Sequence, residues 1–280
     1  VYCSISGFGQ TGPYASQAGY DYLAQGMGGI MAITGEPLGQ PMKVGVAISD
    51  IMCGMYASTA ILSAIRHRDL TDCGQHIDLS LLDTQIAWLA NVGSNYLISG
   101  EEPCRWGNQH PNIVPYQVFE ASDGFIILAV GNDKQFQKFC NFAELDNLSN
   151  DANFSTNASR VENRETLIPI IEEAIKKKSK DYWLMGLKKM GVPSGPINNI
   201  SDALADPHVQ HRNMTITMKH RFSGSGHINL VANPIKMSET PVQYKYSPPS
   251  LSEHTDQVLS ELLGMKADER KHLRANGVIG

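Results

Sequence analysis

The stretch GQHIDLSLLDTQ, residues 74–85, predicts a strand that passes directly into a helix. QHIDLS is rich in strand formers, and LLDTQIAWLANVGSNYLISG has the length and composition of a helix that ends at Gly100, a typical C-terminal stop. Asp83 falls at the start of this helix, where a chain that has just become apolar turns onto its next element. The function of that carboxylate is the first question that the sequence raises.

Two interpretations of Asp83 follow from the spacing alone. Ser80-Leu81-Leu82-Asp83 fits the S-x-x-[DE] pattern, in which an acid in the first turn reaches back to cap the helix. The same position places the carboxylate near the positive end of the helix dipole, where it stays ionised beside apolar neighbours. A poorly hydrated carboxylate is a competent nucleophile toward an activated acyl group. The sequence leaves both roles open.

The elements on either side of this stretch alternate between strand and helix patterns. We expect a strand in VYCSIS, a turn in GFGQTGP, a glycine-loosened helix over 21–33 and a buried helix over 46–68. Further along we expect a hairpin in FEASDGFIILAVG, amphipathic helices over 133–143 and 161–191 separated by the polar loop NDANFSTNASRVENR, strands in MTITMKH and GHINLVANPIKM, and a last helix near 256–263. This order predicts an α/β core with a smaller α+β domain inserted into it.

Composition narrows the class of protein. The 280 residues are 42% hydrophobic and carry a net charge of −5, which supports a packed core and argues against a nucleic-acid surface. The five cysteines form no CxxC pair, so we expect a reducing, cytoplasmic setting. We also expect no membrane association, because no signal peptide is visible and the apolar run 57–65 is too short to span a bilayer.

A glycine-rich turn follows the first strand. Gly7, Gly9 and Gly12 match G-x-G-x-x-G. However, Pro13 closes the turn and no helix starts inside it, and Glu36, the acidic residue that would complete a Rossmann fingerprint, lies in another loop. The motif therefore indicates either a plain turn or a turn whose backbone amides approach a ligand.

The loop RWGNQHPNIVPYQ, residues 105–117, is dense in hydrogen-bonding side chains and is stiffened by prolines. Such a segment is either a solvated linker or a ligand-contacting loop. The histidines show no HExxH or H-x-x-x-H spacing, so we expect no metal site. The signatures G-x-S-x-G and S-x-x-K are also missing from the sequence.

Taken together, YCSISGFGQTGPYASQAGYD, VGVAISDIMCGMYASTAILSAI, GQHIDLSLLDTQ and GNQHPNIVPYQVF resemble the class III CoA-transferases, the CaiB–BaiF family, over nearly the whole chain. GVPSGPIN and DPHV support the same resemblance. The GNxHPxIxPYQ form looks like the succinyl-CoA:dicarboxylate transferases, and the family also includes the formyl-CoA transferases.

The resemblance implies a covalent mechanism on Asp83. The aspartate would attack an acyl-CoA thioester to give a mixed anhydride, and CoA would return to form an aspartyl-CoA thioester that an acceptor carboxylate then resolves. The co-substrate is coenzyme A, without a metal. The resemblance suggests that Gly7, Gly9, Gln10, Gly12, Tyr20 and Asp21 line the cofactor site, and that Arg105, Asn108, His110, Tyr116 and Gln117 contact the substrate.

Two alternatives remain beside the transferase. Racemases of the family use a histidine where this chain has Tyr20, and tyrosine is a poor base at neutral pH, which favours the transferase over a 2-methylacyl-CoA racemase. Family members also begin with a strand–helix–strand unit that contacts the nucleotide and that this sequence lacks, so an inactive fragment is the other alternative.

The resemblance also predicts the organisation of the chain. We expect a Rossmann-like large domain in residues 1–115 and 214–280, the latter ending in a C-terminal helix, with the small domain in 116–213. The implied partners are an acyl-CoA and a small, dicarboxylic acid. The implied assembly is an interlocked homodimer.

Overall fold

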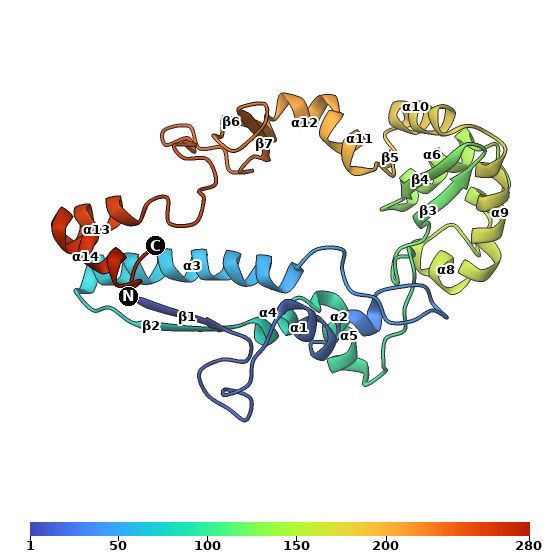
Figure 1. Ribbon diagram of the computed structural model, residues 1–280. Helices are drawn as coiled ribbons and strands as arrows, with labels where there is room; N and C mark the ends of the chain where they lie inside the picture. Colours follow the sequence, from blue (N-terminus) through green and yellow to red (C-terminus); the bar gives the residue numbers. More distant parts are fainter. The chain divides into compact units, whose positions relative to one another are not determined.

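The computed structural model describes residues 1–280 as two compact units, Val1–Ile197 and Asn198–Gly280 (Figure 1). The division falls inside the stretch that the sequence assigns to the small domain, and the three-part organisation stays a prediction.

The first unit begins with a parallel pair of strands, as the sequence predicts. β1 (Tyr2–Ser6) pairs with β2 (His76–Ser80) so that Tyr2 lies opposite His76 and Ser6 opposite Ser80. A parallel pair needs a crossover connection, and the helix α3 (Ile48–Thr71) supplies it by packing along both strands (Figure 1). This βαβ arrangement confirms the α/β class of the fold.

Two helices that the sequence predicts as continuous are each divided in the structure. The expected helix over 21–33 breaks at Gly28-Gly29, where Gly29 has a φ of +85°. The expected helix over 81–100 breaks after Trp88, and Ala90 has a φ of +46°. The resulting elements are α1 (Asp21–Met27), α2 (Ile30–Ile33), α4 (Leu81–Ala87) and α5 (Ala90–Ser99).

The length of α3 corrects one expectation from the sequence. The apolar run at 57–65 is too short to cross a bilayer, but the whole helix of 24 residues is long and apolar enough to do so by length and composition. A single helix of this kind is weak evidence for a membrane span, because core helices of water-soluble proteins satisfy the same criteria. Its buried side includes Cys53, Ala57 and Ala64, which face the neighbouring elements of the fold.

The remainder of the first unit is an α+β segment with its own core. β3 (Tyr116–Ala121) and β4 (Gly124–Ala129) form the predicted hairpin, and β5 (Ser194–Pro196) adds a third antiparallel strand. Buried aromatic and aliphatic residues of the sheet and helices, such as Phe119, Phe139 and Leu167, fill the space between them. The helices are α6 (Asp133–Phe142), α7 (Asp146–Asn150), α8 (Asn157–Glu162), α9 (Arg164–Lys176) and α10 (Lys180–Met190).

The prediction of a polar loop between the amphipathic helices is wrong in part. α8 lies within it, and the Oγ1 of Thr156 caps α8 by accepting from the amide of Ser159. The sequence pattern does not indicate this short helix, because its one fully buried residue is the charged Arg160 and no apolar periodicity marks it.

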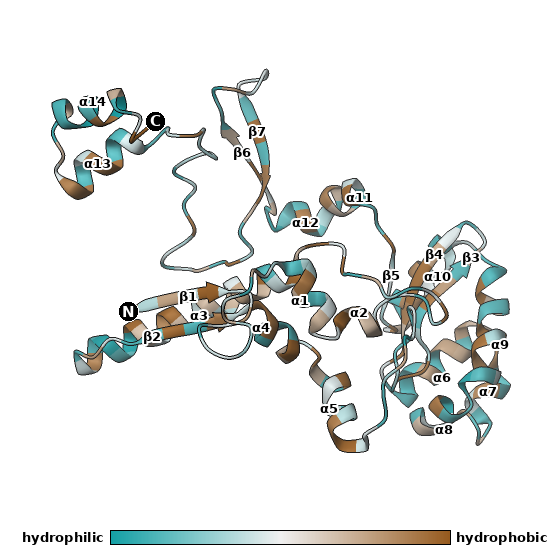
Figure 2. Cartoon of the chain, turned by 60° about the horizontal axis from the view of Figure 1, so that its bottom comes forward, coloured by the Kyte–Doolittle hydropathy of each residue, from teal (hydrophilic) through white to brown (hydrophobic).

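The second unit contains the two strands and the helix that the sequence predicts. β6 (Thr215–Lys219) and β7 (His227–Val231) pair antiparallel, with Thr215 opposite Val231. The helices are α11 (Ile200–Ala205), α12 (Pro207–His211), α13 (Thr255–Leu263) and α14 (Ala267–Ala275). Figure 2 shows α14 as mostly hydrophilic, and none of its residues is buried.

The close approach of α1 to α4 depends on Gly28. A Cβ at this position would overlap Cγ of Gln85 and lie 2.7 Å from the carbonyl oxygen of Ala24. We therefore expect Gly28→Ala to lower the free energy of unfolding by about 1–3 kcal/mol, measured by urea denaturation. Gly54→Ala is the matched control: Gly54 lies inside α3 with nothing within 4 Å of the added Cβ. That change should raise stability by about 0.5–1 kcal/mol, and equal effects of the two substitutions would contradict the packing argument.

Candidate active site

Asp83 lies in the first turn of α4 and its side chain is not used by the helix. The Oγ of Ser80 accepts a hydrogen bond from the amide of Asp83 at 2.9 Å, which is one half of a capping box. The reciprocal bond is not formed, since the Asp83 carboxylate makes no hydrogen bond or ion pair with any residue of the chain. Asp83 is exposed. The capping role thus belongs to Ser80, and the carboxylate is free to meet a ligand.

A buried polar network fixes the helix that carries Asp83. Gln85, 1% exposed, accepts a hydrogen bond at 2.7 Å from the Oγ of Ser49 in α3. The amide of Ser49 donates to Oδ1 of Asp21 in α1, and the other oxygen of Asp21 accepts from Nε2 of Gln25. Since buried polar groups are costly to leave unpaired, these bonds tie α1, α3 and α4 into one arrangement.

The glycine-rich turn lies against the start of α4. The amide of Leu82 donates to the carbonyl of Gly7 at 3.1 Å, and a Cβ on Gly7 would come within 2.5 Å of the Cα of Gly19. Gly9 and Gly12 have φ values of +89° and +91°, in the left-handed region that favours glycine. The turn therefore has a structural need for its glycines, and the structure brings it next to the Asp83 helix.

Two backbone amides of the glycine-rich turn are already engaged within the chain. The amide of Gly9 donates to Oγ of Ser6 at 2.9 Å, and that of Gln10 donates to the carboxylate of Asp78 at 3.0 Å. The side-chain amide of Gln10, in contrast, makes no hydrogen bond within the chain. The predicted role of this turn in binding a ligand therefore depends on the Gln10 side chain rather than on these two amides.

Tyr20 and Asp21, both predicted to line the cofactor site, have different surroundings in the structure. Tyr20 is 78% exposed and its hydroxyl is free to approach a ligand. Both oxygens of Asp21 accept hydrogen bonds from the protein, one of them from the first turn of α3. Asp21 therefore joins α1 to α3, and its cofactor contact stays a prediction.

The loop over 105–117 is fixed at one end by Arg105. The guanidinium donates to the carbonyl oxygens of Ala32, Glu36 and Gly39, at 3.3, 3.1 and 2.6 Å respectively. These bonds attach the loop to the segment that follows α2. With its donors directed at backbone carbonyls, Arg105 has a structural role here, and its contact with the substrate stays a prediction.

The other predicted substrate residues lie along the same loop. His110 packs on Tyr116 with ring centroids 5.3 Å apart, and its Nδ1 accepts from the amide of Asn112. In the neutral ring the proton then resides on Nε2, which is available as a donor. Asn108 is exposed, whereas Gln117 is 7% exposed within β3. No hydrogen bond or ion pair joins this loop to α4.

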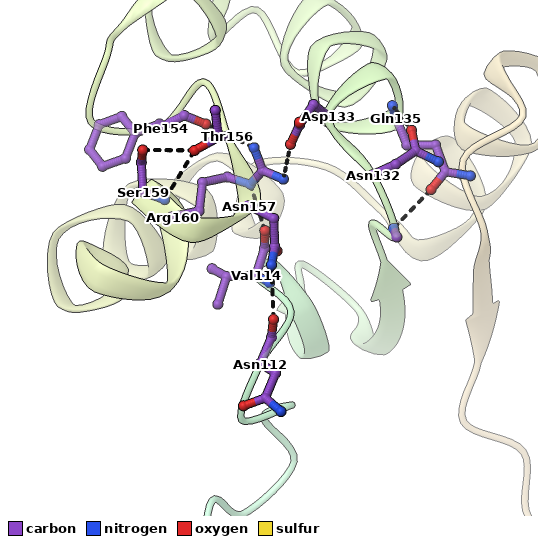
Figure 3. Close-up of polar contacts among 11 residues, drawn as sticks. Asn112, Val114, Asn132, Asp133, Gln135, Phe154, Thr156, Asn157, Ser159 and Arg160 are labelled. Carbon is purple, nitrogen blue, oxygen red and sulfur yellow. Dashed lines mark hydrogen bonds and ion pairs between the residues drawn. The ribbon is translucent and has the colours of Figure 1, made fainter. Parts of the chain in front are cut away.

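Two buried arginines that the sequence did not single out hold the loop from the other side. Arg160 is fully buried and donates to the carbonyls of Val114 and Phe154 and to Asp133 (Figure 3). Arg164 donates to the carbonyls of His110 and Pro111. Local sequence offers no signal for these contacts, because each arginine lies in a polar stretch about 50 residues from its loop partners.

The cysteines and possible metal ligands give no further site. Burial raises the pKa of the Cys140 thiol to about 12 and also raises that of Cys53, so both thiols stay protonated at neutral pH. No group of histidine, cysteine, aspartate or glutamate side chains in the chain is arranged to hold a metal ion.

The family of the chain follows from comparison with known proteins. Residues 1–255 match CoA-transferase family III, and the chain belongs to this family. A crystal structure of a CaiB/BaiF family protein from Brucella suis has 46% sequence identity and a TM-score of 0.78, with 94% of this chain and 68% of that chain covered. The resemblance seen in the sequence is confirmed.

Curated relatives carry names of CoA-transferases. A succinate–glutarate CoA-transferase of Agrobacterium fabrum is 49% identical over 94% of this chain, and the human succinyl-CoA:glutarate CoA-transferase is 39% identical over 94%. The chain spans 65% and 60% of the lengths of these two relatives.

The cap at Ser80 gives a testable prediction. Ser80 is 1% exposed, and Ser80→Ala removes the hydroxyl that accepts from the amide of Asp83. We therefore expect the free energy of unfolding to fall by about 1 kcal/mol. Ser80→Thr retains a hydroxyl and should recover most of the loss. Urea denaturation of the three proteins measures both effects, and an unchanged stability in Ser80→Ala would rule out the cap.

Proposed function

We propose that this chain carries the nucleophile and acceptor-binding elements of an enzyme that transfers coenzyme A from an acyl-CoA donor to a carboxylic acid. The observation that supports this most directly is the Asp83 carboxylate, which stands at the start of a firmly held helix and has no partner within the chain. Membership of CoA-transferase family III supports the same reaction.

The chemistry proceeds by exchange of acyl groups on Asp83. The carboxylate attacks the thioester carbon of the donor, and the C–S bond then breaks. CoA leaves as the thiolate, and a mixed anhydride between Asp83 and the donor acid remains. The thiolate then attacks the aspartyl carbonyl, releasing the donor acid and leaving an aspartyl-CoA thioester. The acceptor carboxylate displaces CoA in the same way, and the thiolate takes the acceptor's acyl group, which restores Asp83.

The residues around Asp83 have separate roles in this scheme. Hydrogen-bond donors that stabilise the oxyanion of such tetrahedral intermediates contribute several kcal/mol, about 2.7–4 for a single donor. We assign this role to the side-chain amide of Gln10, because it makes no hydrogen bond within the chain while the backbone amides of Gly9 and Gln10 are engaged. The exposed hydroxyl of Tyr20 supplies a second polar contact for the acyl-CoA.

The relatives' names guide the choice of acids. Those described above act on succinyl-CoA or succinate together with glutarate, and another relative, from Haloarcula hispanica, is a succinyl-CoA:mesaconate CoA-transferase that is 34% identical. We propose that this chain likewise serves a short dicarboxylic acid. A homodimer and a cytoplasmic location are part of the same proposal.

The racemase alternative receives no specific support. It needs a base opposite Asp83, and the histidine of the racemases is replaced by Tyr20. We therefore propose no second reaction.

Replacement of the nucleophile tests the proposal. Asp83→Asn keeps the shape of the side chain but cannot form the anhydride, so we expect succinyl-CoA:glutarate transfer to fall roughly 10⁴-fold or more. Asp50→Asn is the matched control, because it removes an acidic residue from the first turn of α3 without touching this site. Succinyl-CoA consumption with glutarate as acceptor measures the rate. Transfer retained by Asp83→Asn, with Asp50→Asn equally active, would refute the role of Asp83.

A further inference from the structure

Arg160 and Arg164 occupy similar surroundings but differ in their charge partners. Both guanidiniums donate to backbone carbonyls and both stack on an aromatic ring, Arg160 on Phe136 at 4.4 Å and Arg164 on Trp106 at 4.3 Å. Arg160 also forms an ion pair with Asp133 at 2.9 Å (Figure 3). Arg164, which is 7% exposed, has no acidic side chain within ion-pair distance. It is therefore a buried cation without a counter-charge.

Such a cation is unusual on physical grounds. A charge taken out of water is costly unless an opposite charge or several hydrogen bonds replace the lost hydration. Burial lowers the pKa of Arg164 from its ordinary value, although the group stays charged at neutral pH. Of its three polar contacts, the one between Nη1 and Oε1 of Gln109 is the longest, at 3.4 Å. This neutral carboxamide occupies the place where an anion would bind best.

A cavity of about 410 Å³ adjoins this group. Its lining includes Trp106, Gln109 and Pro111, all of which contact Arg164, together with the amide side chains of Asn95 and Asn112. The lining also holds two glutamates, but both are exposed and neither pairs with Arg164. The volume is ample for a four- or five-carbon acid, and the buried positive charge lies behind one wall.

We propose that this cavity binds a small carboxylic acid, whose carboxylate displaces the side chain of Gln109 and pairs with the guanidinium of Arg164. The planar fork of arginine matches a carboxylate in two parallel hydrogen bonds, which makes it better suited than lysine to this task. The stacked ring of Trp106 and the two loop carbonyls hold the guanidinium in place. We take the bound acid to be the acceptor of the reaction, with one carboxylate on Arg164 and the other left to react. This assignment rests on the function proposed above.

Binding of glutarate to the protein without CoA tests the site, measured by ligand-detected NMR titration. We expect Arg164→Gln to weaken binding roughly ten- to hundredfold, the usual effect of losing a charge-assisted pair. Lys177→Gln, which removes the same charge from an exposed position on the same segment, should bind as the unmodified protein does. Glutaramide, the neutral isostere, should not bind. An unchanged glutarate affinity in Arg164→Gln would overturn the proposal.

A second variant keeps the test decisive if Arg164→Gln fails to fold. Gln109→Glu places a carboxylate of the chain itself against Arg164, so it should raise the melting temperature and abolish glutarate binding. Unchanged glutarate affinity in Gln109→Glu would contradict the proposal. Binding is measured without CoA, so a failure to bind glutarate would not bear on the proposed role of Asp83. Conversely, an Asp83→Asn protein that is still active would not bear on the glutarate site.

Discussion

The hydrogen bond between Gln85 and Ser49 is the constraint on which the candidate active site depends. α4 has only seven residues, and a helix this short is not stable by its own propensity. Its position comes from the buried bonds that join it through Ser49 to Asp21 and Gln25, and from the absence of a side chain on Gly28. With its own helix capped by Ser80, the carboxylate of Asp83 is left unpaired at a fixed place.

The loop over 105–117 is held by a different set of bonds with the same result. Arg105 donates from the start of the loop to backbone carbonyls outside it, whereas Arg160 and Arg164 donate to carbonyls within it. Prolines limit its freedom further. The loop is thus a preformed wall that presents His110 and Tyr116. The composition of the loop agrees with that finding, because Gly107 is the one glycine in residues 105–117.

The sequence predicts an element well where the local residue pattern determines it. It fails where contacts with residues far along the chain determine the structure. The strand at 76–80, the cap at Ser80 and the hairpin at Ala121–Gly124 have local signals, and all three are present. The break in the first helix falls at Gly28-Gly29, which the sequence already marks as a loosened place, whereas the break after Trp88 has no glycine or proline to signal it. Asp21 and the two buried arginines make hydrogen bonds to partners far along the chain. Propensity and spacing do not reveal such contacts.

In the proposed reaction Asp83 itself accepts the acyl group, and trapping of the intermediate measures this step. Incubation with succinyl-CoA followed by hydroxylamine should convert the activated aspartate to a hydroxamate, which peptide mass spectrometry locates. We expect one modified residue, Asp83, and no modification when CoA replaces succinyl-CoA. A hydroxamate at another carboxylate, or acyl transfer without any trapped aspartate, would contradict it.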